Sequence, residues 1–185
     1  IENAAKEPEI VNVATFLNNM GAKIRGAGTE TITIKGVEHL HKAFHEVIPD
    51  RIEAGTYIII GALLGENLKI KRIIPTHVES LTSKLIEAGA DMEIKEDEII
   101  INAKDKYKSV NIKTQPYPGF PTDLQQPLIP FLTKCRGTST VEETIYENRF
   151  QNIYDTNRMG ANIIVKNNKI AKVKGITPLH GKNVT

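Results

Sequence analysis

The sequence repeats itself with a period of about 70 residues, and this repeat limits the folds open to the chain. A triplet of the form Met/Ala-Gly-Ala occurs three times, with its glycines at Gly21, Gly89 and Gly160, so the spacings are 68 and 71 residues. Repeats of this kind fold as copies of one supersecondary unit that stack on one another. The chain is therefore expected to contain several similar copies of a small unit.

Each triplet follows a helical pattern and precedes a hairpin pattern. Apolar residues recur at helical spacing before the triplet, as Ile10, Val13, Ala14 and Leu17 do before the first. Glycine commonly ends helices because it adopts the left-handed conformation without strain. Two β-branched segments around a polar turn then predict paired strands. These strands are expected at residues 91–94 and 98–101, at 23–24 and 31–34, and at 162–165 and 169–173.

The front half of the repeat is a helix followed by one strand. Pro49-Asp50 opens an apolar helix that is expected to end at Gly65, and Pro121-Thr122-Asp123 opens another that is expected to end at Gly137. Short strands follow at residues 68–73 and 138–145. The unit is thus helix, strand, helix, strand, strand. Residues 49–115 form one copy, residues 116–185 most of another, and residues 1–36 the back half of an earlier one.

This order of elements predicts an α/β fold in which helices pack against small sheets. The helical segment 58–64 is apolar nearly all round, so helices are expected at the centre and sheets outside them. The repeats are cut at both ends, so we expect an internal fragment of a longer array.

Composition excludes several classes of function. The net charge is only +2, the Lys and Arg residues form no stripe, and Trp is absent, so no nucleic-acid partner is expected. No apolar run reaches the length that spans a bilayer, so no membrane contact is expected. The single cysteine, Cys135, fits a reducing cytosol.

Four short sequence motifs identify a protein family more specifically than the periodicity does. They are Glu2-Asn3-Ala4-Ala5-Lys6-Glu7-Pro8-Glu9-Ile10, Pro49-Asp50-Arg51-Ile52-Glu53-Ala54-Gly55-Thr56, Pro118-Gly119-Phe120-Pro121-Thr122-Asp123-Leu124-Gln125 and Glu147-Asn148-Arg149-Phe150. In order and spacing the chain resembles the UDP-N-acetylglucosamine 1-carboxyvinyltransferases, which are enolpyruvyl transferases. The resemblance runs along all 185 residues and covers less than half of a family member.

The resemblance implies an inside-out α/β barrel of repeated βαβαββ units, with helices central and sheets outside, present here in part. Residues 1–48 would finish one domain, and residues 49–185 would supply two units of a second domain. The implied reaction moves the enolpyruvyl group of phosphoenolpyruvate onto the 3'-hydroxyl of UDP-N-acetylglucosamine and releases phosphate. It is the first committed step of peptidoglycan synthesis, hence of cell-wall formation, cell shape and division, in the cytoplasm. It uses no metal or other cofactor.

The resemblance also implies that parts of the catalytic machinery are missing. The family's catalytic Cys loop, its Lys-Asn pair and several phosphate-binding Arg residues fall before Ile1 or otherwise outside this chain. The chain alone is therefore expected to be inactive.

Asp123 is the first candidate for a site residue. By resemblance it contacts the sugar hydroxyl and acts as general base, because a neutral hydroxyl is a poor nucleophile. From the residues alone, Asp123 is instead expected to cap a helix, like Asp50, which has Glu53 at the capping-box spacing. We interpret Asp50 mainly as a cap, and Asp50 and Arg51 have only a weak claim to a ligand.

Ile145 and Arg149 are the other candidates for substrate binding. By resemblance Ile145 touches the nucleotide sugar through its backbone, whereas its residue type alone favours a buried strand position. Arg149 is expected at a helix start, where a cation is unfavourable, so it is a candidate for holding an anionic substrate or a carboxylate. The alternative is a weak surface ion pair with Glu147 or Glu143.

Other reactive side chains are given structural interpretations. Cys135 matches no catalytic position of the family and is expected to be a partly buried structural thiol late in a helix. His39, His41 and His45 lack the further ligands of a convincing metal set.

Two further hypotheses stay open. One is the related 3-phosphoshikimate 1-carboxyvinyltransferase, which shares the fold and the enolpyruvyl donor. The other is a non-catalytic α/β repeat module that binds partners, for which an exposed apolar patch is expected.

Overall fold

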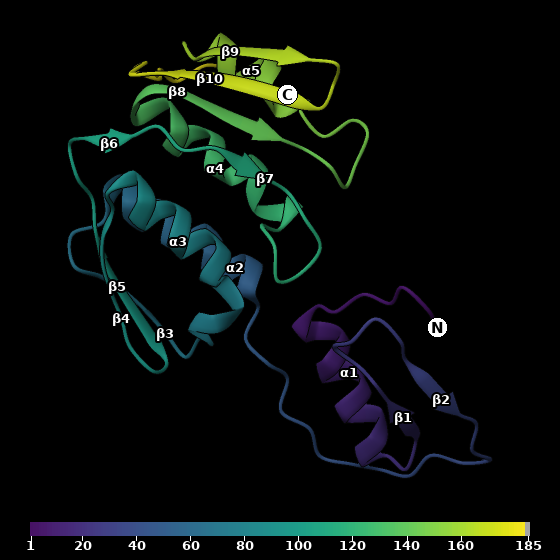
Figure 1. Ribbon diagram of the computed structural model, residues 1–185. Coiled ribbons are helices and arrows are strands. Elements are labelled where there is room, and N and C mark those ends of the chain that lie inside the picture. The colour runs from purple at the N-terminus through teal and green to yellow at the C-terminus, as the bar shows by residue number, and fades with distance from the viewer. Residues whose placement is uncertain (184–185) are drawn as a thin grey trace. The chain divides into compact units, whose positions relative to one another are not determined.

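The computed structural model describes residues 1–183, which form two compact units (Figure 1). Unit 1 consists of Ile1–Pro49 together with Pro116–Pro118. Unit 2 consists of Asp50–Gln115 together with the chain from Gly119 onward. The assignment of these residues to two domains of the family stays a prediction.

Unit 1 is a helix followed by a hairpin, as predicted for the back half of a repeat. Helix α1 spans Pro8–Asn19, and strand β1 (Lys23–Arg25) pairs antiparallel with strand β2 (Thr33–Lys35). Ala14 on α1 and Ile32 just before β2 are buried within this small unit.

The first complete repeat opens unit 2 and has the predicted order of elements. Its elements are α2 (Arg51–Leu64), β3 (Leu68–Lys71), the 3-10 turn η1 (Pro75–Val78), α3 (Glu79–Ala88), β4 (Asp91–Ile94) and β5 (Glu98–Asn102). Asp50 caps α2, since its Oδ1 accepts hydrogen bonds from the amides of Ile52 at 2.7 Å and Glu53 at 3.2 Å. The strands form an antiparallel sheet in the order β3-β5-β4.

The second repeat follows in unit 2. Its elements are α4 (Thr122–Lys134), β8 (Cys135–Glu142), α5 (Asn152–Arg158), β9 (Asn162–Lys166) and β10 (Ile170–Gly175). Two short strands that were not predicted, β6 (Tyr107–Lys108) and β7 (Ile112–Lys113), precede it. Strands β8, β10 and β9 are antiparallel neighbours in that order, which repeats the order β3-β5-β4. Strands β6 and β7 lie parallel to β8. The predicted repeat is therefore confirmed at the level of strand topology.

The glycine after the second helix of each repeat ends that helix in the left-handed conformation, as predicted. The three triplet glycines are left-handed, with φ of +98° at Gly21, +98° at Gly89 and +108° at Gly160. In the first and third copies an asparagine side chain then binds the backbone of the next strand. Asn18 Oδ1 accepts from the Ile24 amide at 2.8 Å and Asn18 Nδ2 donates to the Ile24 carbonyl at 2.9 Å. Asn157 makes the same two bonds to Ile163, at 3.0 Å from the amide and 2.9 Å to the carbonyl. The repeat thus extends to side-chain hydrogen bonds.

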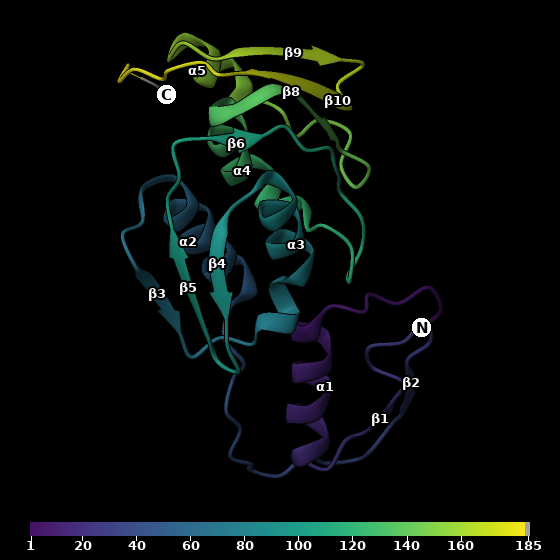
Figure 2. The same cartoon turned by 60° about the vertical axis from the view of Figure 1, so that its left-hand side comes forward.

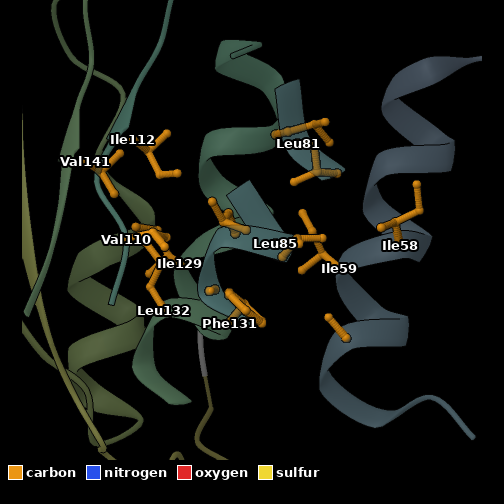
Figure 3. Packing of buried hydrophobic residues seen from close by; sticks show 14 of the residues in the cluster. Ile58, Ile59, Leu81, Leu85, Val110, Ile112, Ile129, Phe131, Leu132 and Val141 are labelled. Carbon is orange, nitrogen blue, oxygen red and sulfur yellow. The ribbon is translucent and has the colours of Figure 1, made fainter. Parts of the chain in front are cut away.

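Helices α2, α3 and α4 of unit 2 lie between its two sheets, as predicted (Figures 1 and 2). Figure 3 shows Ile59 of α2 and Ile129 of α4 in one continuous apolar core, which reaches Val141 of β8 and Ile112 of β7. All four residues are at most 2% exposed. Residues 1–183 contain the central helices and outer sheets of the predicted architecture but do not close into a barrel.

Helix α2 approaches its neighbours closely because it carries two glycines. A β-carbon added at Gly61 would lie 2.2 Å from Cγ2 of Ile101 on β5, and one at Gly55 would lie 2.5 Å from Cδ1 of Leu124 on α4. Both positions are buried. These contacts explain the apolar residues on two sides of the helix, while a third side with Tyr57, Ile60 and Leu64 is exposed.

The boundary between α4 and β8 differs from the prediction. The helix ends at Lys134 and the strand starts at Cys135, whereas the helix was expected to reach Gly137 and the strand to cover residues 138–145. Strand pairing explains the shift, because Cys135 already pairs with β6 and Gly137 pairs with Gly175 of β10. The predicted position of Cys135 within a helix is therefore wrong.

Candidate active site

Asp123 lies in the first turn of α4, which begins at Thr122. The predicted N-cap role is wrong for Asp123, because Pro121 occupies the cap position and no side chain caps this helix. The helix begins two residues earlier than a cap at Asp123 would place it. The Asp123 side chain is 53% exposed and reaches a neighbouring segment. A carboxylate is still favoured there by the helix dipole.

Arg149 meets this carboxylate from the loop between β8 and α5. It precedes α5, so its predicted position at a helix start is wrong. Its Nη2 donates to Oδ1 of Asp123 and its Nη1 donates to Oγ1 of Thr122 at 3.2 Å. Its guanidinium carbon also lies 4.8 Å from the centre of the Tyr146 ring, within cation–π range. The carboxylate bound by Arg149 is that of Asp123 rather than Glu147 or Glu143.

Ile145 belongs to the same loop and is not a core residue. Strand β8 ends at Glu142 and the Ile145 side chain is 39% exposed, so the alternative of a buried strand position is wrong. Its amide donates to Oε1 of Glu143 at 2.8 Å. A ligand that binds Ile145 through the backbone would therefore meet its carbonyl oxygen, because the single amide hydrogen is already donated.

Glu143 is a buried carboxylate that sequence reasoning missed. It has no exposed surface, and it accepts four hydrogen bonds. Oε1 accepts from Thr114 Oγ1 at 2.9 Å, from the Ile145 amide at 2.8 Å and from the Tyr146 amide at 3.1 Å. Oε2 accepts from Thr122 Oγ1 at 2.8 Å. Buried charged groups need such partners, but no local pattern in the sequence distinguishes Glu143 from a surface glutamate.

The loop and the start of α4 thus form one hydrogen-bonded cluster around Asp123. Gln126 of α4 adds a bond from its Nε2 to the Arg149 carbonyl at 3.2 Å. Within residues 1–183, no group donates to Oδ2 of Asp123, whereas Oδ1 is held by Arg149. The cluster presents one open carboxylate oxygen, which can accept a proton, beside a fixed cation, which can bind an anion.

Asp50 and Cys135 do not belong to this cluster. The Asp50 carboxylate caps α2 through two amides, as predicted. Cys135 is fully buried, and burial raises the pKa of its thiol to about 12. The thiolate is the nucleophilic form of cysteine, so this residue is a structural thiol, and it is buried more completely than predicted.

The histidines of unit 1 lie in a segment without helix, so the spacing of His39, His41 and His45 does not place them on one helix face. In the part of the chain that the structure describes, no group of three or more His, Cys, Asp or Glu side chains is placed to hold a metal ion. None of the helices formed by residues 1–183 combines the length and the apolar character needed to cross a bilayer.

Comparison with known proteins gives a family match along the whole chain. Residues 1–185 match the family model described as EPSP synthase (3-phosphoshikimate 1-carboxyvinyltransferase). The chain is 52% identical over 185 residues to UDP-N-acetylglucosamine 1-carboxyvinyltransferase 2 of Listeria monocytogenes serotype 4b (strain F2365), and covers 44% of that protein. It is 53% identical over 184 residues to the protein of the same name from Shouchella clausii (strain KSM-K16), and covers 43% of it. The chain thus spans less than half the length of the curated relatives it matches.

Solved structures with similar folds are also enolpyruvyl transferases. The chain matches the enolpyruvyl transferase NikO from Streptomyces tendae with a TM-score of 0.86 at 26% identity, covering 97% of this chain and 43% of NikO. It matches EPSP synthase from Acinetobacter baumannii with a TM-score of 0.50 at 15% identity, covering 92% of this chain and 40% of that one. The second likeness concerns the fold alone.

Proposed function

Because the chain belongs to the EPSP synthase family, we propose that it supplies part of the active site of a UDP-N-acetylglucosamine 1-carboxyvinyltransferase. In this reaction the enolpyruvyl group of phosphoenolpyruvate moves to the 3'-hydroxyl of UDP-N-acetylglucosamine and phosphate leaves. The proposal is carried by the contact between Asp123 and Arg149, which leaves one carboxylate oxygen open beside a cation. Relatives at 52% and 53% identity bear the name of this enzyme.

Asp123 is the general base in this proposal. Its Oδ2 accepts the proton of the sugar hydroxyl as the oxygen attacks C2 of phosphoenolpyruvate, while C3 takes a proton from a general acid outside this cluster, which gives a tetrahedral intermediate with a methyl group. Loss of a proton from that methyl group together with departure of phosphate then restores the double bond in the product. A positioned base of this kind contributes about 10²- to 10⁴-fold to rate. The bond from Arg149 to Oδ1 fixes the direction in which Oδ2 points.

Arg149 and Ile145 bind the acceptor in this proposal. Arg149 is only 25% exposed, so its charge acts close to Asp123 with limited screening by water. Ile145 offers its carbonyl oxygen to a donor on the nucleotide sugar, since its amide is bonded to Glu143. Both substrates carry phosphate groups, which do not cross membranes unaided, so we place the reaction in the cytoplasm. It supports peptidoglycan synthesis, and through it cell shape and division.

The hypothesis of a 3-phosphoshikimate 1-carboxyvinyltransferase differs from this proposal in the acceptor of the enolpyruvyl group. The family model is named after the 3-phosphoshikimate enzyme, but the EPSP synthase from Acinetobacter baumannii is only 15% identical to this chain. The sugar-nucleotide transferases are 52% and 53% identical over essentially the same residues. We therefore favour UDP-N-acetylglucosamine over 3-phosphoshikimate as the acceptor.

The test is phosphate release from phosphoenolpyruvate by the full-length protein that contains this chain. We expect release with UDP-N-acetylglucosamine and none with 3-phosphoshikimate. The opposite preference would establish the related enzyme instead. The 185-residue chain by itself is expected to release no phosphate, because it has no counterpart of the family's catalytic Cys loop. Robust turnover by this chain alone would contradict that expectation.

One observation favours the hypothesis of a binding module. Helix α2 exposes Tyr57, Ile60 and Leu64, which lie on one helix face at spacings of three and four residues. An apolar stripe of this kind is typical of a surface that packs against other protein. A full-length protein that self-associates through this stripe and releases no phosphate with either acceptor would support a module rather than an enzyme.

A further inference from the structure

We propose that Glu143 is a positioning residue that sets the orientation of Arg149 through Thr122 and fixes the loop of residues 143–149 against α4. This inference rests on the proposed function for its effect on catalysis. Glu143 is fully buried and both of its carboxylate oxygens already accept hydrogen bonds, so it does not itself contact substrate.

The direction of the hydrogen bonds identifies Thr122 as the intermediary. The Arg149 guanidinium has only donors, so Thr122 Oγ1 must accept its bond of 3.2 Å. The hydroxyl hydrogen of Thr122 is therefore free to point at Oε2 of Glu143, at 2.8 Å. As long as Glu143 offers an acceptor, the lone pairs of Thr122 face Arg149.

The other oxygen of Glu143 fixes the loop. Oε1 binds the amides of Ile145 and Tyr146 and the hydroxyl of Thr114, which follows β7. Thr114 Oγ1 also accepts from the Thr144 amide at 2.8 Å. One carboxylate thus joins the end of β7, the start of α4 and the loop that carries Arg149.

The chemical consequence concerns Asp123. Arg149 reaches Asp123 Oδ1 with one nitrogen and Thr122 with the other, so a change at Thr122 alters the angle of the guanidinium at Asp123. Displacing a catalytic group by about 1 Å can cost about a hundredfold in rate. Binding of phosphoenolpyruvate, for which the resemblance implies arginines outside this chain, is not expected to change.

The substitution Glu143→Gln separates the orientation of Thr122 by Oε2 from the fixing of the loop by Oε1. The glutamine carbonyl can replace Oε1 and keep its three bonds, whereas the amide nitrogen replaces Oε2 and becomes a donor facing Thr122. Two donors then compete for the Thr122 oxygen. In the full-length protein we expect kcat/KM for UDP-N-acetylglucosamine to fall about ten- to a hundredfold. The KM for phosphoenolpyruvate and the melting temperature should stay near their wild-type values.

Glu142→Gln is the matched control. Glu142 is the adjacent residue, and its exposed carboxylate forms a surface ion pair with Lys113 at 3.2 Å. The same chemical change there is expected to leave both kinetic constants unaltered. If Glu143→Gln behaves like Glu142→Gln, the positioning role is refuted.

A second measurement tests the geometry without relying on activity. Hydrogen exchange by NMR should show faster exchange of the Arg149 guanidinium protons in Glu143→Gln, with the Ile145 and Tyr146 amides still protected. In Glu143→Ala those two amides should lose protection as well. Unchanged Arg149 exchange in both variants would overturn the inference. If the wild-type protein fails to transfer the enolpyruvyl group while the hydrogen-exchange pattern of the variants is still as expected, the proposed function is wrong and the positioning role of Glu143 is retained.

Discussion

Arg149 binds Asp123 and its neighbour Thr122 with two different nitrogens of one guanidinium. The two partners are adjacent residues in the first turn of α4, and Arg149 lies 26 residues further along the chain from Asp123. The fork of the guanidinium matches this pair of oxygens in a way that a single ammonium group does not.

Arg149→Lys should therefore reduce activity although it keeps the charge. We expect kcat/KM for UDP-N-acetylglucosamine in the full-length protein to fall by about tenfold or more, because the single nitrogen of lysine cannot reproduce the two-nitrogen fork that holds both oxygens. Arg158→Lys is the control, since Arg158 has an Asp155 partner at 3.1 Å and lies 5.8 Å from the Tyr154 ring on the surface of α5. Equal losses in the two variants would argue against a special role for Arg149.

Asp123→Asn tests the base directly. Asparagine is nearly the same size but cannot accept a proton, so kcat should fall by about 10²- to 10⁴-fold. Asp105, an exposed aspartate of unit 2, provides the control substitution Asp105→Asn. Steady-state phosphate release measures both. A variant of Asp123 that retains more than half of the wild-type kcat would exclude this residue as the base.

Cys135 should be unreactive in the folded chain. Burial raises the pKa of its thiol to about 12, so at pH 8 the thiolate fraction is about a thousandfold below that of an ordinary cysteine. Labelling with a chromogenic disulfide should be slow in buffer and rapid in denaturant. Rapid labelling of the folded chain would show that the thiol is accessible and ionised.

The same thiol should make stability depend on pH. Its pKa is higher in the folded state than the ordinary value of 9.0, so the folded state holds the proton more tightly. The free energy of unfolding should therefore decrease as the pH rises from about 9 toward 12. Urea unfolding should show a steeper decrease for the wild type than for Cys135→Ala. Parallel curves for the two proteins would contradict the shift.

Gly89→Ala should show the free-energy cost of placing a residue with a β-carbon in the left-handed conformation at the end of α3. Gly89 has a φ of +98°, and no atom lies within 4 Å of the position that a β-carbon would take. The cost is therefore the left-handed conformation alone, about 1–2 kcal/mol in the free energy of unfolding. Gly89→Asn should lose less, since asparagine tolerates this conformation better. Urea unfolding of the 185-residue chain measures the free energy of unfolding of the wild type, Gly89→Ala and Gly89→Asn. Equal values for the three proteins would show that the left-handed conformation at this position has no cost.

The repeat could be predicted from the sequence because short-range chemistry specifies it. Gly89 ends a helix through its own backbone freedom, and Asp50 caps a helix through amides two and three residues away. The hairpin strands were predicted from β-branched residues and polar turns within the same segments. In each case, the residues that determine the structure are neighbours in the chain.

The features that sequence reasoning missed depend on distant residues. The end of α4 is set by pairing of Cys135 with Tyr107 and of Gly137 with Gly175, which lie 28 and 38 residues away. Glu143 is buried because it meets Thr114, which lies 29 residues earlier. Asp123 resembled a helix cap because Asp50 is one, but α4 begins before Asp123 and its carboxylate binds Arg149 instead of backbone amides.

The direct junction between α4 and β8 limits how Asp123 can move. No turn separates Lys134 from Cys135, and Lys134 also donates from Nζ to the Leu63 carbonyl of α2 at 3.0 Å. Sliding or tilting of α4 at this end would break strand pairs of β8, which lies within the five-stranded sheet. Asp123 is therefore carried on a helix whose C-terminal end is fixed to the sheet, so α4 and β8 move together as one rigid piece.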